Sequence, residues 1–197
     1  ETAEMPGMYA PGDYDLAGFA VGCVNRRDLI DGSRVSAGDV LLGLAASGPH
    51  SNGYSLIRAV LDRVPGALEE SLGDTSLATA LMQPTRIYVR ALLALIAATP
   101  VHALAHVTGG GLIENVPRVL PAGTRADIDF AAWQRPAVFD WLATAGDIPE
   151  EEMLRTFNCG IGMVVVVPAD TADTAMDLLQ TAGETVFRIG HIAAESA

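Results

Sequence analysis

The sequence predicts an α/β fold, a layered sandwich in which helices cover a β-sheet. Apolar runs of strand length alternate along the chain with runs of helical apolar spacing, which is the pattern of packed α/β layers. Half of the 197 residues are hydrophobic and 18% are charged, which is ample for a sizeable core. The length fits one large domain, or one domain with part of another.

The predicted elements of the first half follow from short local patterns. Residues 14–24 form an apolar stretch of strand length, and residues 30–33 have the composition of a turn. An almost continuous apolar run at 40–46 is typical of a buried strand. Helical apolar spacing then predicts a helix over 55–64 and, after a poorly patterned loop, another over 85–98, each ended by a proline.

The second half continues the alternation. Its most β-branched segment, 163–167, is predicted to be a strand. The order of the strands in the sheet does not follow from this pattern. The other expected elements are a strand over 102–107, a helix over 112–120, a strand over 124–130, a helix over 136–145, a helical turn over 150–155, a helix over 170–181 and a strand over 185–193.

The charge of the chain disfavours two classes of partner. The net charge is −12 and the sequence pI is near 4.5. Non-specific binding of nucleic acid or of an anionic membrane needs basic patches, so neither is expected. An acidic protein still binds anions where backbone amides supply local positive potential.

The cysteines indicate a reduced setting. Cys23 and Cys159 lie far apart in apolar contexts, so neither a disulfide framework nor a zinc site is expected and the cytoplasm is the predicted location. The longest apolar run, 91–98, is too short for a membrane span.

Two glycine-bearing stretches carry the main functional signal. They read SGPHSNGY at 47–54 and HVTGGG at 106–111, and each follows a predicted strand and opens a predicted helix. Such a turn presents unpaired backbone N–H groups and the positive end of a helix dipole. Phosphate and carboxylate bind at sites of this kind. The two turns therefore predict a protein that handles a phosphorylated metabolite.

Four segments together resemble one enzyme family. They are ETAEMPGMY at 1–9, SGPHSNGYSL at 47–56, HVTGGGLIENVPRVLP at 106–121 and TFNCGIGM at 156–163. In this order they closely resemble the aminoimidazole ribonucleotide synthetases, also called phosphoribosylformylglycinamidine cyclo-ligases, of purine biosynthesis. The resemblance spans nearly the whole chain.

The resemblance implies a division of the chain. Residues 1–30 correspond to the tail of an N-terminal ATP-binding domain and the interdomain segment, and 16–24 to the last strand of that absent domain. Residues 31–197 correspond to the C-terminal substrate-cleft domain. The chain starts without an initiator methionine, which fits the interior of a longer protein. The polypeptide alone is expected to be inactive, because ATP and Mg²⁺ are held mostly by the N-terminal domain, through which members of the family form homodimers.

The resemblance also implies a reaction. The family closes formylglycinamidine ribonucleotide to aminoimidazole ribonucleotide, with ATP consumed and ADP and phosphate released. The formyl oxygen is phosphorylated, and the amidine nitrogen then attacks the activated carbon. Such a site must hold two phosphate-bearing partners in line.

The candidate site residues follow from the glycine stretches and the resemblance. His50 is the predicted catalytic residue, in contact with transferred phosphate or in proton transfer; the alternative is a histidine that caps its turn. The glycine triplet is expected to bind substrate phosphate or ribose, and the alternative is a tight turn without a ligand. Asn52 or Ser51 is expected to cap the following helix. The predicted substrate-binding or phosphate-binding residues are Ser47, Gly48, Ser51, Asn52, Gly53, Thr108, Gly109, Gly110, Gly111 and Asn115.

Other polar residues receive a different interpretation. Glu1 is placed near the ATP and metal region by the resemblance, Glu4 is expected to be solvated, and no metal ligand is assigned within the chain. Cys159 is interpreted as a buried structural thiol. The remaining predictions are core or edge positions for His102, His106 and His191 and packing roles for Trp133 and Trp141.

Two alternative functions remain open at the level of sequence. One is another ATP-using member of the same superfamily, whose relatives act on thiamine phosphate, on selenium, in hydrogenase maturation and in the preceding purine step. The other is a non-catalytic domain that binds a phosphorylated ligand or a protein partner.

Overall fold

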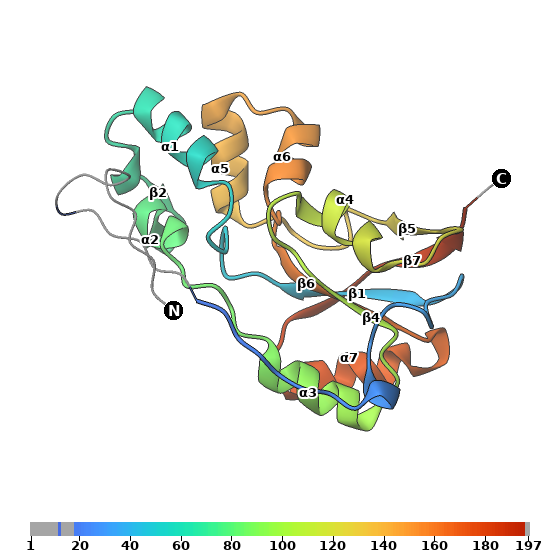
Figure 1. The fold of residues 1–197 in the computed structure, drawn as a ribbon. Coiled ribbons are helices and arrows are strands. Elements are labelled where there is room, and N and C mark those ends of the chain that lie inside the picture. Colours follow the sequence, from blue (N-terminus) through green and yellow to red (C-terminus); the bar gives the residue numbers. More distant parts are fainter. Residues whose placement is uncertain (1–11, 13–17, 196–197) are drawn as a thin grey trace.

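A five-stranded sheet forms the centre of the protein. The computed structural model describes residues 12 and 18–195. The sheet has the order β4-β6-β1-β7-β5, and all its neighbouring strands are antiparallel (Figure 1). The strands are β1 (Val40–Ala45), β4 (Ala103–His106), β5 (Thr124–Ile128), β6 (Ile161–Val167) and β7 (Val186–Ala194).

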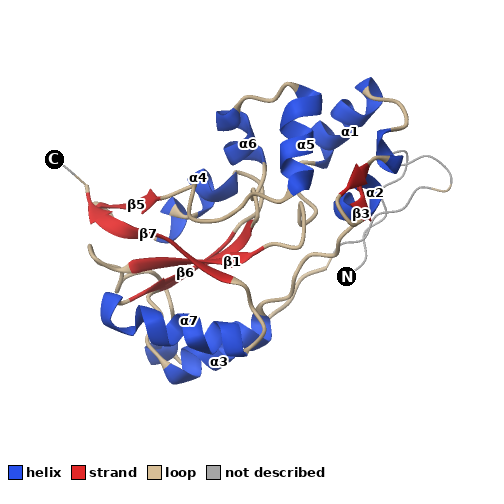
Figure 2. Cartoon of the chain, turned by 180° about the vertical axis from the view of Figure 1, so that it is seen from behind, coloured by secondary structure: helices blue, strands red, loops and turns tan. Residues whose placement is uncertain are grey.

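Helices cover both faces of this sheet. The helices α3 (Val89–Ala98) and α7 (Ala172–Thr181) lie on one face, and α4 (Gly111–Asn115), α5 (Ala137–Gly146) and α6 (Glu150–Thr156) lie toward the other (Figures 1 and 2). Alternate side chains of a strand point to opposite faces. Leu42 and Leu44 of β1 accordingly pack with α3 and α7, whereas Leu41 packs with Leu112 on the α4 side.

A second group of helices extends from one end of the sheet. It contains α1 (Tyr54–Arg63), α2 (Leu77–Leu81), α5 and α6, which share a core around Phe139, Leu142 and Phe157. The short hairpin of β2 (Ser71–Leu72) and β3 (Thr75–Ser76) joins them. The chain also contains four 3₁₀ turns within the described residues: η1 (Arg26–Asp28), η2 (Ala67–Glu69), η3 (Pro117–Val119) and η4 (Ala169–Thr171).

The predicted fold class is confirmed, since a layered α/β fold is what the structure contains. The strands expected over 40–46, 102–107, 124–130, 163–167 and 185–193 all exist, with ends shifted by one or two residues. The helices expected over 55–64 and 136–145 also exist, and the helical turn over 150–155 is the helix α6. Buried apolar runs and helical spacing thus gave reliable local signals.

Three predicted elements are wrong in part. No strand occurs over 18–24, the described part of the predicted strand 14–24, because no other strand of the described chain lies beside it to share backbone hydrogen bonds. The helix expected over 85–98 begins only at Val89. The helix expected over 112–120 is the five-residue α4 followed by the 3₁₀ turn that Pro117 opens. Helix α2 was not predicted.

Candidate functional site

The sheet topology brings the two glycine stretches to one edge. Strands β1 and β4 flank β6 and both run antiparallel to it, so both end where β6 begins. Ala45 at the end of β1 pairs with Ile161, and His106 at the end of β4 pairs with Met163. The turns that follow β1 and β4 therefore meet the 158–160 segment that precedes β6. Three of the four segments that resemble the cyclo-ligases converge there.

Asn158 connects two of these segments directly. Its Nδ2 donates to the carbonyl of Gly48 at 2.8 Å, and its Oδ1 accepts from the backbone N–H of Gly160 at 2.8 Å. The backbone N–H of Ala46 also donates to the Gly160 carbonyl at 2.8 Å. Asn158 is buried, so its side chain replaces water as the partner of both backbone groups. This role was not predicted from the sequence, because the bond to Gly48 joins residues 110 positions apart.

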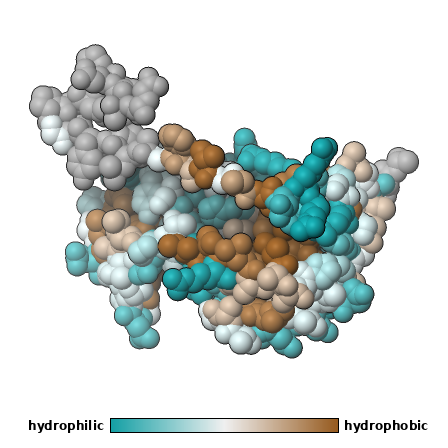
Figure 3. Space-filling model, turned by 60° about the horizontal axis from the view of Figure 1, so that its bottom comes forward, coloured by the Kyte–Doolittle hydropathy of each residue, from teal (hydrophilic) through white to brown (hydrophobic). Residues whose placement is uncertain are grey.

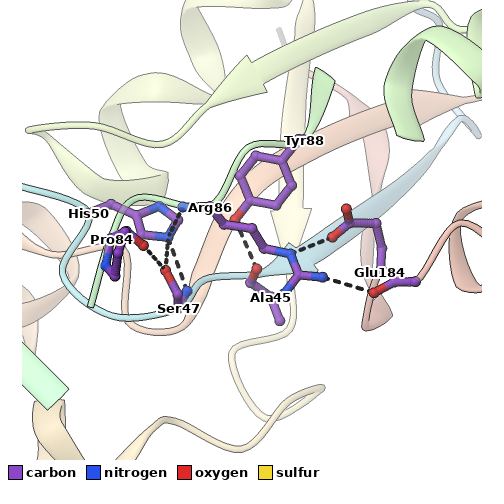
Figure 4. A network of polar contacts seen from close by, with 8 residues as sticks. Ala45, Ser47, His50, Pro84, Arg86, Tyr88 and Glu184 are labelled. Atoms are coloured by element: carbon purple, nitrogen blue, oxygen red, sulfur yellow. Dashed lines mark hydrogen bonds and ion pairs between the residues drawn. The ribbon is translucent and has the colours of Figure 1, made fainter. Parts of the chain in front are cut away.

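The imidazole of His50 points into the protein. Its Nε2 accepts from the backbone N–H of Ser47 at 3.0 Å and from that of Arg86 at 3.3 Å (Figure 4). His50 is buried and has a φ of 52°, a left-handed conformation. Burial is the main cause that lowers the pKa of His50, with smaller contributions from His106 and Arg86. These hydrogen bonds are those of a histidine that caps its own turn, the alternative stated for His50. The catalytic role of His50 stays a prediction.

A segment that is neither helix nor strand, 83–88, crosses beside His50. The Ser47 hydroxyl donates to the Pro84 carbonyl at 2.6 Å, and the Tyr88 hydroxyl donates to the Ala45 carbonyl at 2.8 Å (Figure 4). Arg86 Nε lies 2.7 Å from Glu184 Oε2, and its Nη2 donates to the Gly183 carbonyl at 2.8 Å. These contacts explain why the predicted helix starts at Val89. Sequence reasoning missed Arg86 and Glu184, because their contact joins residues 98 positions apart.

The start of α1 differs from the expected capping. Neither Ser51 nor Asn52 caps the helix: the N-cap is Gly53, at φ 74°, with no side-chain hydrogen bond. Asn52 Nδ2 instead donates to the His50 carbonyl at 2.8 Å. A Cβ on Gly53 would lie 2.3 Å from Phe157 Cε1, so the missing side chain lets α1 start against this ring. The first N–H groups of α1 remain without a side-chain acceptor, and Ser51 is exposed next to them.

The glycine triplet is fastened by Asn115. Asn115 is buried, and its Nδ2 donates to the carbonyls of Gly111 at 2.8 Å and Gly109 at 3.2 Å. Its Oδ1 accepts from the Thr108 hydroxyl at 3.2 Å. The Asn115 side chain therefore closes the turn and does not face a cleft. Of the triplet, Gly109 is exposed, and a Cβ added to it would have no atom within 4 Å, whereas a Cβ on Gly110 would meet Glu114.

Gly111 packs against α6. A Cβ on Gly111 would lie 1.9 Å from the Leu154 carbonyl oxygen, and its φ is 57°. The close approach of α4 to α6 thus accounts for this glycine without a ligand. Helix α4 has only five residues, so its start is a weaker anion site than the sequence indicated.

Cys159 is a buried structural thiol, as predicted. Its Sγ lies 3.4 Å from the Met153 carbonyl oxygen, and its own carbonyl accepts from Trp133 Nε1 at 2.9 Å. Burial raises the pKa of the Cys159 thiol from its ordinary 9.0 to about 11. The nucleophilic thiolate is therefore scarce near neutral pH.

The two cysteines should consequently differ in reactivity. At pH 8 the shift of the pKa from 9.0 to about 11 lowers the thiolate fraction of Cys159 about 100-fold. Cys23 is exposed, and we expect a thiol reagent such as iodoacetamide to label it at least about 100-fold faster. Peptide mass spectrometry over a time course measures both rates. Labelling of Cys159 in the folded protein at the rate of Cys23 would contradict this assignment, and labelling in denaturant serves as the control.

The remaining predicted residues lie apart from the site or only beside it. His102 Nδ1 lies 2.7 Å from Asp39 Oδ2, a satisfied position as expected, and His191 is exposed on β7. Trp133 is a packing residue, and Trp141 Nε1 donates to Glu70 at 2.8 Å. Glu1 and Glu4 lie outside the described residues.

No three His, Cys, Asp or Glu side chains gather as metal ligands within 18–195, and no helix of that range is long and apolar enough to cross a bilayer.

Two hollows adjoin the 83–88 segment. One of about 330 Å³ is lined by Ser47 and Gln83 among others, and one of about 290 Å³ is lined by Arg86, Tyr88 and His106 among others. A larger hollow of about 460 Å³ lies between α4 and β5, and none of the predicted site residues lines it. The segment 83–88 therefore contributes residues to both hollows, and His50 lines neither of them.

Comparison with known families gives a match over most of the chain. Residues 36–197 match the family described as "AIR synthase related protein, C-terminal domain". This range holds the whole sheet and all seven helices of the described residues.

Solved structures share the fold. A thiamine-monophosphate kinase from Stenotrophomonas maltophilia has a TM-score of 0.59 at 22% identity, over 88% of this chain and 53% of that one. The hydrogenase maturation protein HypE in complex with ATP has a TM-score of 0.53 at 19% identity, over 83% and 44%. PurL of T. maritima, complexed with AMPPCP, has a TM-score of 0.54 at 12% identity, over 87% and 24%. The chain spans about half the length of the first two proteins.

Proposed function

Since the chain belongs to the family of AIR synthase related C-terminal domains, we propose that it is the substrate-binding half of an ATP-dependent cyclo-ligase. The proposed reaction closes formylglycinamidine ribonucleotide to aminoimidazole ribonucleotide in purine biosynthesis, in the cytoplasm. One observation carries the proposal: the glycine turns at 47–53 and 108–111, which resemble those of the cyclo-ligases, lie together at one sheet edge with the 158–160 segment.

The chemistry assigns a role to each part of this edge. The formyl oxygen attacks the γ-phosphorus of ATP and ADP leaves; the amidine nitrogen then attacks the formyl carbon and phosphate leaves. The uncapped N–H groups at the start of α1, beside Ser51, suit an anionic group, and Gly109 offers a backbone that a ligand can approach. Thr108 and His50 supply nearby polar groups. ATP and Mg²⁺ are assigned to a separate ATP-binding domain, with homodimers formed by the assembled enzyme.

We propose that the ATP-binding domain docks on the outer face of α3. This helix is apolar on two sides: Ala91, Leu92 and Leu95 face the core, whereas Val89 and Leu93 are exposed, Leu93 by 61%. A helix that is apolar all round is normally covered. Figure 3 shows this side of the molecule, with apolar atoms in a band across its middle. On α3 and in the seven residues before it, 82–88, the exposed large apolar residues are Met82, Ile87, Val89, Leu93 and Ile96.

The position of the segment 18–29 favours a second domain as the partner that covers the outer face of α3. It runs beside α3, and Arg27 and Asp28 share a hollow with Ile96 at the end of the helix (Figure 1). Phe19 is 92% and Val21 89% exposed, so the segment adds apolar surface next to the α3 face. A domain joined through this segment is held beside α3. The match covers only about half of each solved structure, and the remaining half of each is long enough for a second domain. A second copy of this chain would instead bring another net charge of −12 to the contact, which disfavours it.

Reconstitution tests the function and the docking face together. We expect the chain mixed with an ATP-binding domain of a cyclo-ligase to form aminoimidazole ribonucleotide from the substrate and ATP, and neither part to do so alone. Leu93→Asp should weaken this complementation at least about tenfold, because a carboxylate would be buried in an apolar contact. Leu68→Asp, at an exposed position on η2, is the matched control. Product formation by chromatography and complex formation by ultracentrifugation measure the two effects.

The outcomes separate the alternatives. A stable complex that binds the substrate without any turnover would contradict the cyclo-ligase and favour a non-catalytic binding domain. Equal loss of complementation in both leucine variants would contradict docking on α3. The similarity in fold to thiamine-monophosphate kinase favours one further candidate, another ATP-using enzyme of the superfamily. Phosphorylation of thiamine monophosphate by the reconstituted enzyme, with no ring closure, would support that candidate instead.

A further inference from the structure

His50 is held by donors on only one of its two ring nitrogens. The backbone N–H groups of Ser47 and Arg86 both donate to Nε2, at 3.0 and 3.3 Å. The Ser47 hydroxyl lies 3.0 Å from Nε2, but its own proton goes to the Pro84 carbonyl at 2.6 Å. Two N–H donors aimed at one nitrogen require its lone pair. The neutral ring therefore carries its proton on Nδ1.

The other nitrogen has no partner. Nδ1 is the one buried side-chain nitrogen or oxygen of the described residues without a hydrogen bond. It faces Gly162: a Cβ there would lie 2.9 Å from Nδ1 and 2.2 Å from the Tyr88 hydroxyl oxygen. A buried donor without an acceptor is unfavourable. The contacts at Nε2 must outweigh that cost to keep the ring in this orientation.

The contact from Arg86 depends on a distant anchor. Glu184 is nearly buried, with 7% of its side chain exposed, and its Oε2 lies 2.7 Å from Arg86 Nε. Arg86 Nη2 also donates to the Gly183 carbonyl at 2.8 Å. The Arg86 side chain is 36% exposed, so only the Glu184 end of the pair is shielded from water, and the charge-assisted hydrogen bond is directional. It holds the main chain at Arg86 where its N–H reaches Nε2, and the Tyr88 hydroxyl fixes the end of the same segment on Ala45.

We propose that Arg86 is a positioning residue which, anchored on Glu184, locks His50 as the neutral tautomer with its proton on Nδ1. Nε2 is then occupied by two N–H donors and is not available as a base. The tautomer itself does not depend on the proposed cyclo-ligase; only the use of His50 in a reaction rests on that proposal. The groups that surround the ring are Ser47, Arg86, Tyr88 and His106; burial, His106 and Arg86 all lower the pKa of His50, which fits a ring that stays neutral at pH 7.

The tautomer is observable without turnover. In the chain labelled with ¹⁵N-histidine, long-range ¹H–¹⁵N spectra distinguish protonated from unprotonated ring nitrogens, and His50→Gln identifies the signals of His50 among the four histidines. We expect the proton on Nδ1, unchanged from pH 8 to below pH 6.5, the ordinary histidine pKa. Glu184→Ala should lower the ratio of the two tautomers at least about tenfold, or about 1.4 kcal/mol, and raise the pKa of His50.

Matched variants separate positioning from a general loss of stability. Glu184→Gln keeps an acceptor for Arg86 Nε and should keep the pattern of the unmodified chain. Arg125→Ala removes an exposed ion pair with Asp127 at 2.8 Å and should leave His50 unaffected. If circular dichroism shows that Glu184→Ala is unfolded, Arg86→Lys replaces it, because an ammonium group lacks the fork that bonds both Glu184 and Gly183.

Two results would overturn the proposal. One is a proton on Nε2 of His50 in the unmodified chain. The other is a folded Glu184→Ala or Arg86→Lys variant whose His50 signals and pKa match those of the unmodified chain. Both are read from the chain alone, so a failed reconstitution of the cyclo-ligase would leave this result standing, and the reverse also holds.

Discussion

Gly111→Ala should destabilise the protein more than any other single added methyl group in the glycine triplet. Its Cβ would lie 1.9 Å from the Leu154 carbonyl oxygen and 2.9 Å from that of Phe157, and the backbone at Gly111 has a φ of 57°. Relief requires α4 and α6 to move apart. We expect the free energy of unfolding to fall by about 3 kcal/mol, from about 1–2 for the left-handed backbone and about 1–3 for displaced packing.

Gly109→Ala is the matched control for this change. Gly109 lies two residues earlier in the same turn, is exposed, has no atom within 4 Å of an added Cβ and does not have a positive φ. Its substitution should change the free energy of unfolding by less than about 0.5 kcal/mol. Urea denaturation of both variants, followed by circular dichroism, measures the difference. Equal stability of the two variants would show that α4 and α6 do not approach each other this closely.

Asn158→Ala should separate the two glycine segments that this side chain joins. It removes the donor to the Gly48 carbonyl and the acceptor from the Gly160 N–H, both in buried bonds. Each buried backbone group left without a partner costs about 1–3 kcal/mol, so we expect a loss of about 2–4 kcal/mol in the free energy of unfolding. In the reconstituted enzyme, turnover should fall at least about tenfold, because the turn after β1 loses its fixed position.

Asn25→Ala provides the comparison for Asn158. Asn25 Nδ2 donates to Asp28 Oδ2 at 3.0 Å in an exposed position, where water can replace the lost bond. The change should be within about 0.5 kcal/mol. Asn158→Asp adds a sharper test, since a carboxylate can accept from the Gly160 N–H but cannot donate to Gly48. A stability equal to that of the unmodified chain for Asn158→Asp would refute the role of the Gly48 bond.

The main elements of the fold could be predicted because their signals are local. Strand β6 is a nearly continuous β-branched run, and its sequence alone identified it. Helix α5 shows apolar side chains at helical spacing after Pro136, and it forms close to the expected range. The glycine turns were also recognised from their residues, and Cys159 from its apolar surroundings. For these features the nearest neighbours in the chain carry most of the information.

The arrangement of the candidate site was decided by contacts between distant parts of the chain. Residues 85–88 were predicted to lie in a helix, yet they precede its first turn, because Arg86 is bonded to Glu184 98 residues away. Asn158 holds Gly48 across 110 residues, and no local pattern announces that bond. Gly111 looks like a ligand-binding glycine in the sequence, but it makes room for α6. The sequence by itself determined the glycine turns and the strands of the sheet, whereas burial and hydrogen bonding in the folded chain decided which polar groups remain free for a ligand.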